Sequence, residues 1–216
     1  MLLLVAGCAN PGRPPVAERS PVFSPRPATY TVNRGDTLYS IAWRFDLDFR
    51  TLAQSNKLQS PYKIVPGQKI HLNSQKTTHT PRARAPTISD TVAAPVTTGW
   101  LWPTTARVTR GYTKNNSGLD FALTRATPIT AAAAGRVVYA GTGLGGFRQL
   151  IIIKHDERFL SAYSLHQTGR VEEGESLRAG QLIAKVTNAD SAALTLHFEI
   201  RKDGQPVDPR SLLGSR

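Results

Sequence analysis

Asp120 and His197, in the C-terminal half of the chain, have the types and surroundings expected near a metal ion. Asp120 ends the segment Asn116-Ser117-Gly118-Leu119-Asp120, and His197 lies in Leu194-Thr195-Leu196-His197-Phe198-Glu199. A catalytic zinc ion is held by three protein ligands and keeps an open position for water. Asn116 is a poor third ligand because its amide oxygen is neutral and weakly basic. The pattern therefore predicts no zinc cofactor, no metal site and no catalytic residue.

The segment around His197 alternates between polar and apolar residues, which predicts a strand. Thr195 and His197 would lie on one face of this strand, and Leu196, Phe198 and Ile200 would face a core. Thr195 cannot accept a proton near neutral pH as an imidazole can. The geometry of a site would therefore be kept while its acid–base chemistry is lost.

Residues 99–216 are predicted to form a mostly antiparallel β domain, because the sequence pattern changes from Trp100 onward. Runs of β-branched and apolar residues recur between glycine-rich turns, and helical periodicity is almost absent. The expected strands are residues 128–131, 135–141, 150–154, 159–163, 181–186 and 194–201.

Residues 100–213 resemble the LytM/lysostaphin-type metallopeptidases. The resemblance is carried by Gly118-Leu119-Asp120, Ala134-Gly135-Arg136-Val137-Val138, Leu196-His197-Phe198-Glu199-Ile200 and Val207-Asp208-Pro209. It implies that Asn116 and Thr195 replace two histidines, and that Leu165 of Tyr163-Ser164-Leu165 replaces a third. His166 lies one residue late, and a one-residue shift on a strand turns the side chain to the other face. The implied degenerate groove comprises Asn116, Asp120, Leu165, Thr195 and His197.

Residues 29–73 are predicted to form a small α+β module in the order strand, helix, helix, strand. Leu38, Ile41, Ala42 and Phe45 have the i, i+3, i+4, i+7 spacing of one helix face. Asp36 or Thr37 would cap this helix, and Asp48 would cap a second helix that buries Phe49, Leu52 and Ala53.

This small module resembles a LysM domain through Tyr30-Thr31-Val32, Gly35-Asp36-Thr37-Leu38 and Val65-Pro66-Gly67-Gln68. The resemblance implies that it binds the N-acetylglucosamine-containing glycan strands of peptidoglycan. For Asp36 and Thr37, helix capping and ligand contact are equally open. The implied glycan-binding residues are Gly35, Asp36, Thr37, Leu38, Asn56, Leu58 and Ile64.

The N-terminus, Val5-Ala6-Gly7-Cys8, resembles a bacterial lipobox. The resemblance implies a lipoprotein signal peptide at residues 1–7 and an acyl anchor on Cys8 that holds the protein in the outer membrane, facing the periplasm. The apolar stretch is short and has no basic residues before it, which indicates that the true start lies upstream. The alternative is a hydrophobic tail with a chance cysteine. Residues 8–28 are a proline-rich tether and residues 74–98 a second flexible linker.

The net charge of +12 is spread along the chain without a run of five or six like charges. Without a basic face carrying interleaved aromatic residues, nucleic acid is not an expected partner, whereas diffuse positive charge suits an acidic cell envelope.

The order of lipobox, LysM, linker and LytM segments resembles the NlpD-type lipoproteins that activate cell-wall amidases. It implies a non-enzymatic protein whose partners are peptidoglycan, an N-acetylmuramoyl-L-alanine amidase and the membrane, through the lipid on Cys8. Two alternatives remain: an active zinc endopeptidase, and a passive peptidoglycan-binding lipoprotein.

Overall fold

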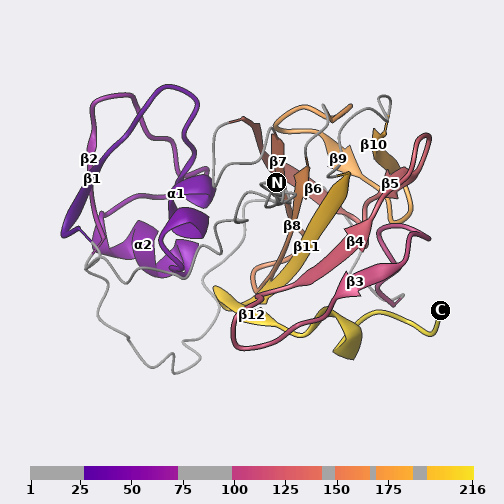
Figure 1. The fold of residues 1–216 in the computed structure, drawn as a ribbon. Helices are drawn as coiled ribbons and strands as arrows, with labels where there is room; N and C mark the ends of the chain where they lie inside the picture. The colour runs from indigo at the N-terminus through magenta and orange to yellow at the C-terminus, as the bar shows by residue number, and fades with distance from the viewer. Residues whose placement is uncertain (1–26, 73–98, 143–148, 166–168, 187–193) are drawn as a thin grey trace, which may run out of the picture.

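A computed structural model describes residues 27–72, 99–142, 149–165, 169–186 and 194–216. The expected signal peptide, Cys8, nearly all of the tether, the linker at 74–98 and His166 lie outside these residues. The described chain forms two parts, here called the N-terminal module (residues 27–72) and the C-terminal domain (residues 99–216) (Figure 1).

The N-terminal module has the expected order of elements: β1 (Thr29–Thr31), α1 (Leu38–Arg44), α2 (Phe49–Ser55) and β2 (Lys69–His71), with β1 and β2 antiparallel. Thr37 caps α1 in a reciprocal box with Ser40, and Asp48 caps α2 through the backbone N–H of Thr51. Asp36 is not the cap, because its carboxylate accepts hydrogen bonds from the Tyr30 hydroxyl and the Asn33 backbone. Thr37 therefore has the capping role that the sequence left open between the two residues.

The C-terminal domain is built on an antiparallel sheet of eight strands, ordered β3-β4-β11-β8-β7-β6-β9 with β12 paired to β11. Strands β5 and β10 form a second, two-stranded sheet. The predicted mostly β fold is confirmed, and all six expected strands are present. The strands are β3 (Val108–Arg110), β4 (Leu119–Ala122), β5 (Pro128–Thr130), β6 (Gly135–Gly141), β7 (Gln149–Lys154), β8 (Phe159–Leu165), β9 (Ser176–Leu177), β10 (Leu182–Lys185), β11 (Thr195–Lys202) and β12 (Gln205–Val207), followed by the short 3₁₀ helix η1 (Pro209–Ser211).

One face of the large sheet packs against the β5–β10 sheet and forms the core of the domain. Leu196, Phe198 and Ile200 of β11 lie in this core with no exposed surface, as the alternation predicts. Because strand side chains alternate between faces, the intervening residues of β11 lie on the opposite face of the sheet.

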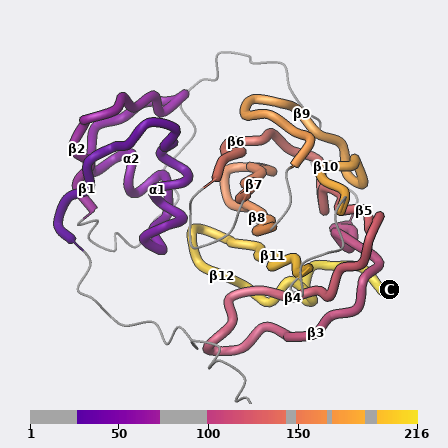
Figure 2. The backbone as a smooth tube through the Cα atoms, turned by 45° about the horizontal axis from the view of Figure 1, so that its top comes forward, coloured from indigo at the N-terminus to yellow at the C-terminus, as the bar shows by residue number. Residues whose placement is uncertain are grey.

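On the opposite face of the large sheet, part of β6, β7 and β8 is covered by the N-terminal module, which lies beside the sheet in both views (Figures 1 and 2). Ile152, Leu160 and Ala162 belong to the same apolar cluster as Ile41 and Leu52 of the module. Burial of apolar surface stabilises contact at roughly 25 cal/mol per Å². The two parts therefore share one continuous apolar interface, a packing that the sequence did not predict.

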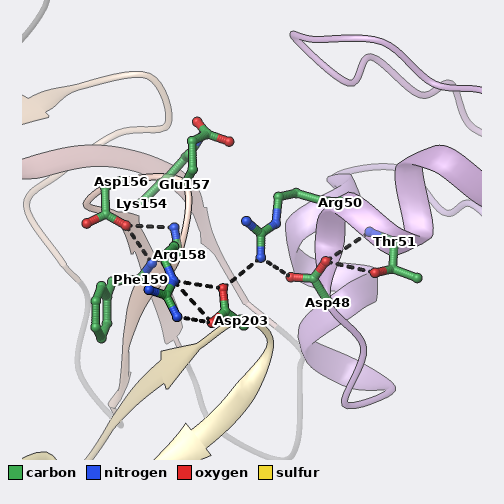
Figure 3. Close-up of polar contacts among 9 residues, drawn as sticks. All are labelled: Asp48, Arg50, Thr51, Lys154, Asp156, Glu157, Arg158, Phe159 and Asp203. Atoms are coloured by element: carbon green, nitrogen blue, oxygen red, sulfur yellow. Dashed lines mark hydrogen bonds and ion pairs between the residues drawn. The ribbon is translucent and has the colours of Figure 1, made fainter. Parts of the chain in front are cut away.

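Charged side chains lie at one edge of this interface (Figure 3). Arg50 of α2 reaches Asp203, in the turn between β11 and β12, at 2.9 Å, and Asp203 also pairs with Arg158 at 2.7 Å. Gly204 follows with a φ of 78°, and a Cβ atom there would lie 2.5 Å from the Cα of Asp48. Glycine is required because the turn has left-handed backbone geometry and lies directly against the N-terminal module.

Candidate functional site

A cavity of about 630 Å³ opens where β11 meets β4 and β8. Asp120 and His197 face each other across β4 and β11, and Asn116 and Thr195 lie beside them, so four of the five predicted groove residues come together. The wall also includes two residues of α1. The full lining is Trp43, Arg44, Thr109, Arg110, Asn116, Asp120, Leu150, Ser164, Thr195, His197 and Glu199.

The His197 ring is held between two carboxylates. Its Nδ1 lies 2.5 Å from Oδ1 of Asp120, and its Nε2 lies 2.9 Å from Oε1 of Glu199. Burial by itself lowers the pKa of His197, but the hydrogen bonds to Asp120 and Glu199 outweigh it and raise the pKa to about 9. The imidazolium therefore persists at neutral pH and donates one N–H hydrogen bond to each carboxylate.

Asn116 and Ser117, which precede β4, make hydrogen bonds next to His197 and its two carboxylates. The Asn116 amide group donates to the backbone oxygens of Gly111, at 2.9 Å, and Gly118, at 3.0 Å. The Ser117 hydroxyl donates to Oε1 of Glu199 at 2.5 Å. The Asn116 side chain therefore holds two backbone segments together.

The zinc that LytM-type peptidases carry does not fit this set of residues. Asp120 and His197 are bonded to each other through a proton, which a metal ion would have to displace. Thr195 and Ser164 stand nearby with neutral hydroxyl groups. Within the described ranges, no group of three or more His, Cys, Asp and Glu residues is placed to hold a metal ion.

The polar network continues from the cavity to the N-terminal module. Arg201 donates from its Nε to Oε2 of Glu199 at 3.2 Å and pairs through another nitrogen with Asp46 at 2.8 Å. Its guanidinium lies 3.7 Å from the centre of the Trp43 ring, a close cation–π contact. Although burial raises the pKa of Glu199, its bonds to His197 and Arg201 lower it below the ordinary value. Asp120, His197, Glu199, Arg201 and Asp46 thus form a chain of alternating charge.

The prediction that Leu165 lines the groove is wrong. Leu165 is fully buried in the core of the C-terminal domain, as is Tyr163 two residues before it. Residues two apart on a regular strand share a face, and Tyr163 already points into the core. Ser164 is opposite His197 in the strand pairing and lines the cavity instead. Sequence reasoning missed Ser164 because the orientation of Tyr163 is set by packing and is not visible in the sequence.

His155 has a structural role. Its Nδ1 lies 2.8 Å from the backbone oxygen of Ala134, and its Nε2 lies 2.7 Å from the Ser161 hydroxyl. Burial lowers the pKa of His155 to about 4, so the ring is neutral at physiological pH. It packs against Trp100 with ring centres 4.6 Å apart. His155 therefore stabilises a part of the domain that does not line the cavity.

Comparison with known proteins agrees with this architecture. Residues 114–209 match the model of peptidase family M23, and residues 30–73 match that of the LysM domain. A lipoprotein NlpD/LppB homolog from Pseudomonas aeruginosa is 35% identical, over 96% of this chain and 83% of the relative. The chain belongs to the NlpD lipoprotein family.

Other relatives in the NlpD family cover most of the chain as well. The lipoprotein YgeR of Escherichia coli is 37% identical over 96% of this chain and 87% of its own length. The murein hydrolase activator NlpD of Escherichia coli is 32% identical over 88% of this chain and 68% of its own. A solved M23-family protein from Pseudomonas aeruginosa shares the fold, with 24% identity and a TM-score of 0.50, over 57% of this chain and 54% of that one. This similarity establishes a shared fold and says nothing about a shared activity.

A second cleft, of about 560 Å³, lies between the two parts of this NlpD-family chain, and the LysM match covers one of its two walls. Asp36, Thr37, Leu38 and Ile64, four of the predicted glycan-binding residues, line it.

The other three predicted glycan-binding residues do not line this cleft. The Asn56 side chain bonds to both backbone groups of His71 and so holds the end of β2. Leu58 packs on the apolar cluster, and Gly35 occupies a turn with a φ of 84°. Tyr39 and Tyr62, which sequence reasoning missed, do line the cleft.

In the described ranges, no helix is both long enough and apolar enough to pass through a bilayer. The relatives from Pseudomonas aeruginosa and Escherichia coli are named as lipoproteins or as murein hydrolase activators.

Proposed function

We propose that this protein binds peptidoglycan and activates an N-acetylmuramoyl-L-alanine amidase, without cutting the cell wall itself. The observation that carries the proposal is the position of the His197 ring, whose two nitrogens are engaged by Asp120 and Glu199 where an M23 peptidase would need a metal-binding imidazole. A peptidase also needs a base or a metal-bound water to attack the peptide bond. Thr195 and Ser164 cannot act as such a base near neutral pH.

The cavity is then a contact surface for the amidase. Arg44 and Arg110 line it; Arg44 also pairs with Asp36 at 3.8 Å, whereas Arg110 donates to a neutral acceptor, the backbone oxygen of Asn115. The carboxylates of the cavity are already engaged with His197 and Arg201, so an acidic segment of the partner suits it. Activation requires that the protein bind the active conformer of the amidase more tightly than the inhibited one. The LysM match supports delivery to peptidoglycan, and the predicted lipid on Cys8 would hold the protein at the outer membrane.

Release of dye from labelled sacculi tests the proposal. The full chain carrying Cys8→Ser is incubated alone, alone with a chelator, and with each of several amidases. We expect no release by the chain alone and strong stimulation of one amidase. Release by the chain alone that the chelator abolishes would instead show an active zinc endopeptidase. Failure to stimulate any amidase, with sacculus binding retained, would leave a passive peptidoglycan-binding protein.

Two charge-reversal variants test the contact surface. Arg110→Glu changes the wall of the cavity, whereas Arg125→Glu changes an exposed residue in the turn between β4 and β5. Arg110→Glu should remove most of the stimulation, and Arg125→Glu should retain it. Equal activity of the two variants would place the amidase contact elsewhere.

A further inference from the structure

The second cleft has walls from both parts of the molecule. The N-terminal module contributes Asp36 to Tyr39 and residues 60–65, and the C-terminal domain contributes Arg136 to Val138, Lys154, Glu173 and Gly174. Because the apolar interface fixes the module against the outer face of the sheet, these two walls face each other across a defined space. A ligand bound there would contact both parts.

Aromatic rings form the wall from the N-terminal module. The Tyr39 and Tyr62 ring centres are 6.1 Å apart in an edge-on arrangement, and Tyr39 packs on Phe49 at 4.7 Å. Tyr62 has a φ of 58°, a left-handed conformation that is rare for a bulky residue and tends to occur where a structure holds a ligand. The hydroxyl groups of both tyrosines are protonated at neutral pH and can donate hydrogen bonds, and burial raises the pKa of each further. Flat apolar rings with polar edges suit the alternating C–H and hydroxyl surfaces of a sugar.

The wall from the C-terminal domain presents an available cation. Arg136 of β6 is exposed, and its guanidinium makes no hydrogen bond or ion pair within the described part of the chain. Lys154, by contrast, is already paired with Glu157. One nitrogen of Arg136 lies beside Gly174, where a Cβ atom would be 3.7 Å away, so the absence of a side chain leaves room next to the guanidinium. A guanidinium matches the two oxygens of a carboxylate better than any other side chain does.

We propose that this cleft binds an amino-sugar chain that carries carboxylates, with its sugar faces on Tyr39 and Tyr62 and a carboxylate on Arg136. The proposal rests on the peptidoglycan binding proposed above and narrows it in two ways. The cleft binds an acidic, peptide-bearing glycan more tightly than a neutral amino-sugar polymer of similar length. The residue that makes this distinction belongs to the C-terminal domain, so the LysM module does not complete the site by itself.

Binding of two probes to the full chain tests this site. One probe is a neutral tetramer of N-acetylglucosamine, and the other is a glycan fragment of similar length that bears muramyl peptides with free carboxylates. Calorimetric titrations compare the unmodified protein, Arg136→Gln and the control Arg125→Gln. We expect Arg136→Gln to weaken binding of the acidic probe about tenfold and to leave binding of the neutral probe unchanged, which also shows that the variant is folded. Arg125→Gln should bind both probes like the unmodified protein.

The outcomes separate this proposal from the proposed function. If Arg136→Gln binds the acidic probe as tightly as the unmodified protein does, or loses both probes equally, the composite cleft is wrong while peptidoglycan binding stands. If the unmodified protein binds neither probe, the peptidoglycan-binding part of the proposed function fails. A Tyr62→Ala variant should weaken both probes, because it removes a sugar-binding face without touching the cation, and unchanged binding would also count against the site.

Discussion

At the cavity end of β11, His197 is held between Asp120 and Glu199, whereas toward the other end Arg201 is covered by the N-terminal module. Both residues lie on the same face of one strand, and both are cations among carboxylates. The first is neutralised within the C-terminal domain, by Asp120 and Glu199. The second needs Asp46 and Trp43 from the other part of the chain. The cavity end should therefore respond to pH, and the interface end to the docking of the two parts.

The largest expected effect is at the interface end. Arg201→Ala removes the charge that pairs with both Glu199 and Asp46, and Glu199 is itself 6% exposed. Glu199 keeps its bond to His197, but Asp120, Glu199 and Asp46 then share this one cation. Removing one partner of a buried ion pair costs about 3–5 kcal/mol. We expect a loss of that size in the free energy of unfolding, measured with urea. Lys202→Ala, at the exposed neighbouring position, is the control and should change it by less than about 0.5 kcal/mol. Similar values for the two variants would mean that the interface does not bury Arg201 in solution.

The second largest effect is expected at the cavity end of β11, where the free energy of unfolding should depend on pH. The pKa of His197 is raised to about 9 from an ordinary 6.5, so its contribution to stability is complete below pH 6.5 and is lost as pH rises through 9. The shift corresponds to roughly 3 kcal/mol. Unfolding free energies from pH 6 to 10 should fall more steeply for the unmodified protein than for His197→Gln, which does not titrate. Parallel curves would show that His197 is not held as an imidazolium.

Much of the fold was predictable because local patterns were strong. The run Ile151-Ile152-Ile153 and the alternation of β11 each fixed a strand, and Asp48 fixed the start of α2. The spacing of Leu38, Ile41 and Ala42 likewise predicted the buried face of α1. In each case the residues that carry the pattern lie close together in the sequence.

The errors arose where distant segments decide the structure. Leu165 was assigned to the groove by its distance from Tyr163, but only the packing shows that Tyr163 faces the core. Ile152 and Leu160 could have been assigned to any buried sheet, and nothing local indicates that another module covers them. Tyr62 was missed because its left-handed backbone is not visible in the sequence.

A third prediction tests the docking without removing a charge. Gly204→Ala and the control Gly180→Ala both place a side chain at a left-handed φ, 78° and 77° respectively. A Cβ atom at Gly204 would lie 2.5 Å from the Asp48 Cα, whereas at Gly180 the nearest atom is the end of Leu101, 3.5 Å away. Both should lose about 1–2 kcal/mol to backbone strain, and Gly204→Ala should lose about 1 kcal/mol more. Small-angle scattering should show expansion for Gly204→Ala alone; equal dimensions would mean that the turn does not contact the module.

The smallest expected effect concerns the ion pair at the edge of the interface. Arg50 and Asp203 have side chains that are 21% and 38% exposed, and Asp203 keeps Arg158 when Arg50 is removed. Its bonds to Arg158 and Arg50 outweigh partial burial and lower the pKa of Asp203 to about 2, so the carboxylate stays charged at neutral pH in either case. Pairs with this exposure contribute at most about 1 kcal/mol and are screened by salt.

Arg50→Ala should therefore reduce the free energy of unfolding by less than about 1 kcal/mol, and less still in 1 M salt, where screening acts within roughly 3 Å. A double-mutant cycle with Asp203→Asn isolates the pair from the hydrogen bond that Arg50 also makes to Asp48. If the coupling energy between Arg50 and Asp203 is as large as the loss from Arg201→Ala, the two ion pairs do not differ as proposed. Arg201 and Glu199 would then not be the strongly stabilising buried pair, with Arg50 and Asp203 the weak exposed one. A small, salt-sensitive coupling would mean that the apolar contacts and Arg201 hold the two parts together, and that Arg50 only adjusts their alignment.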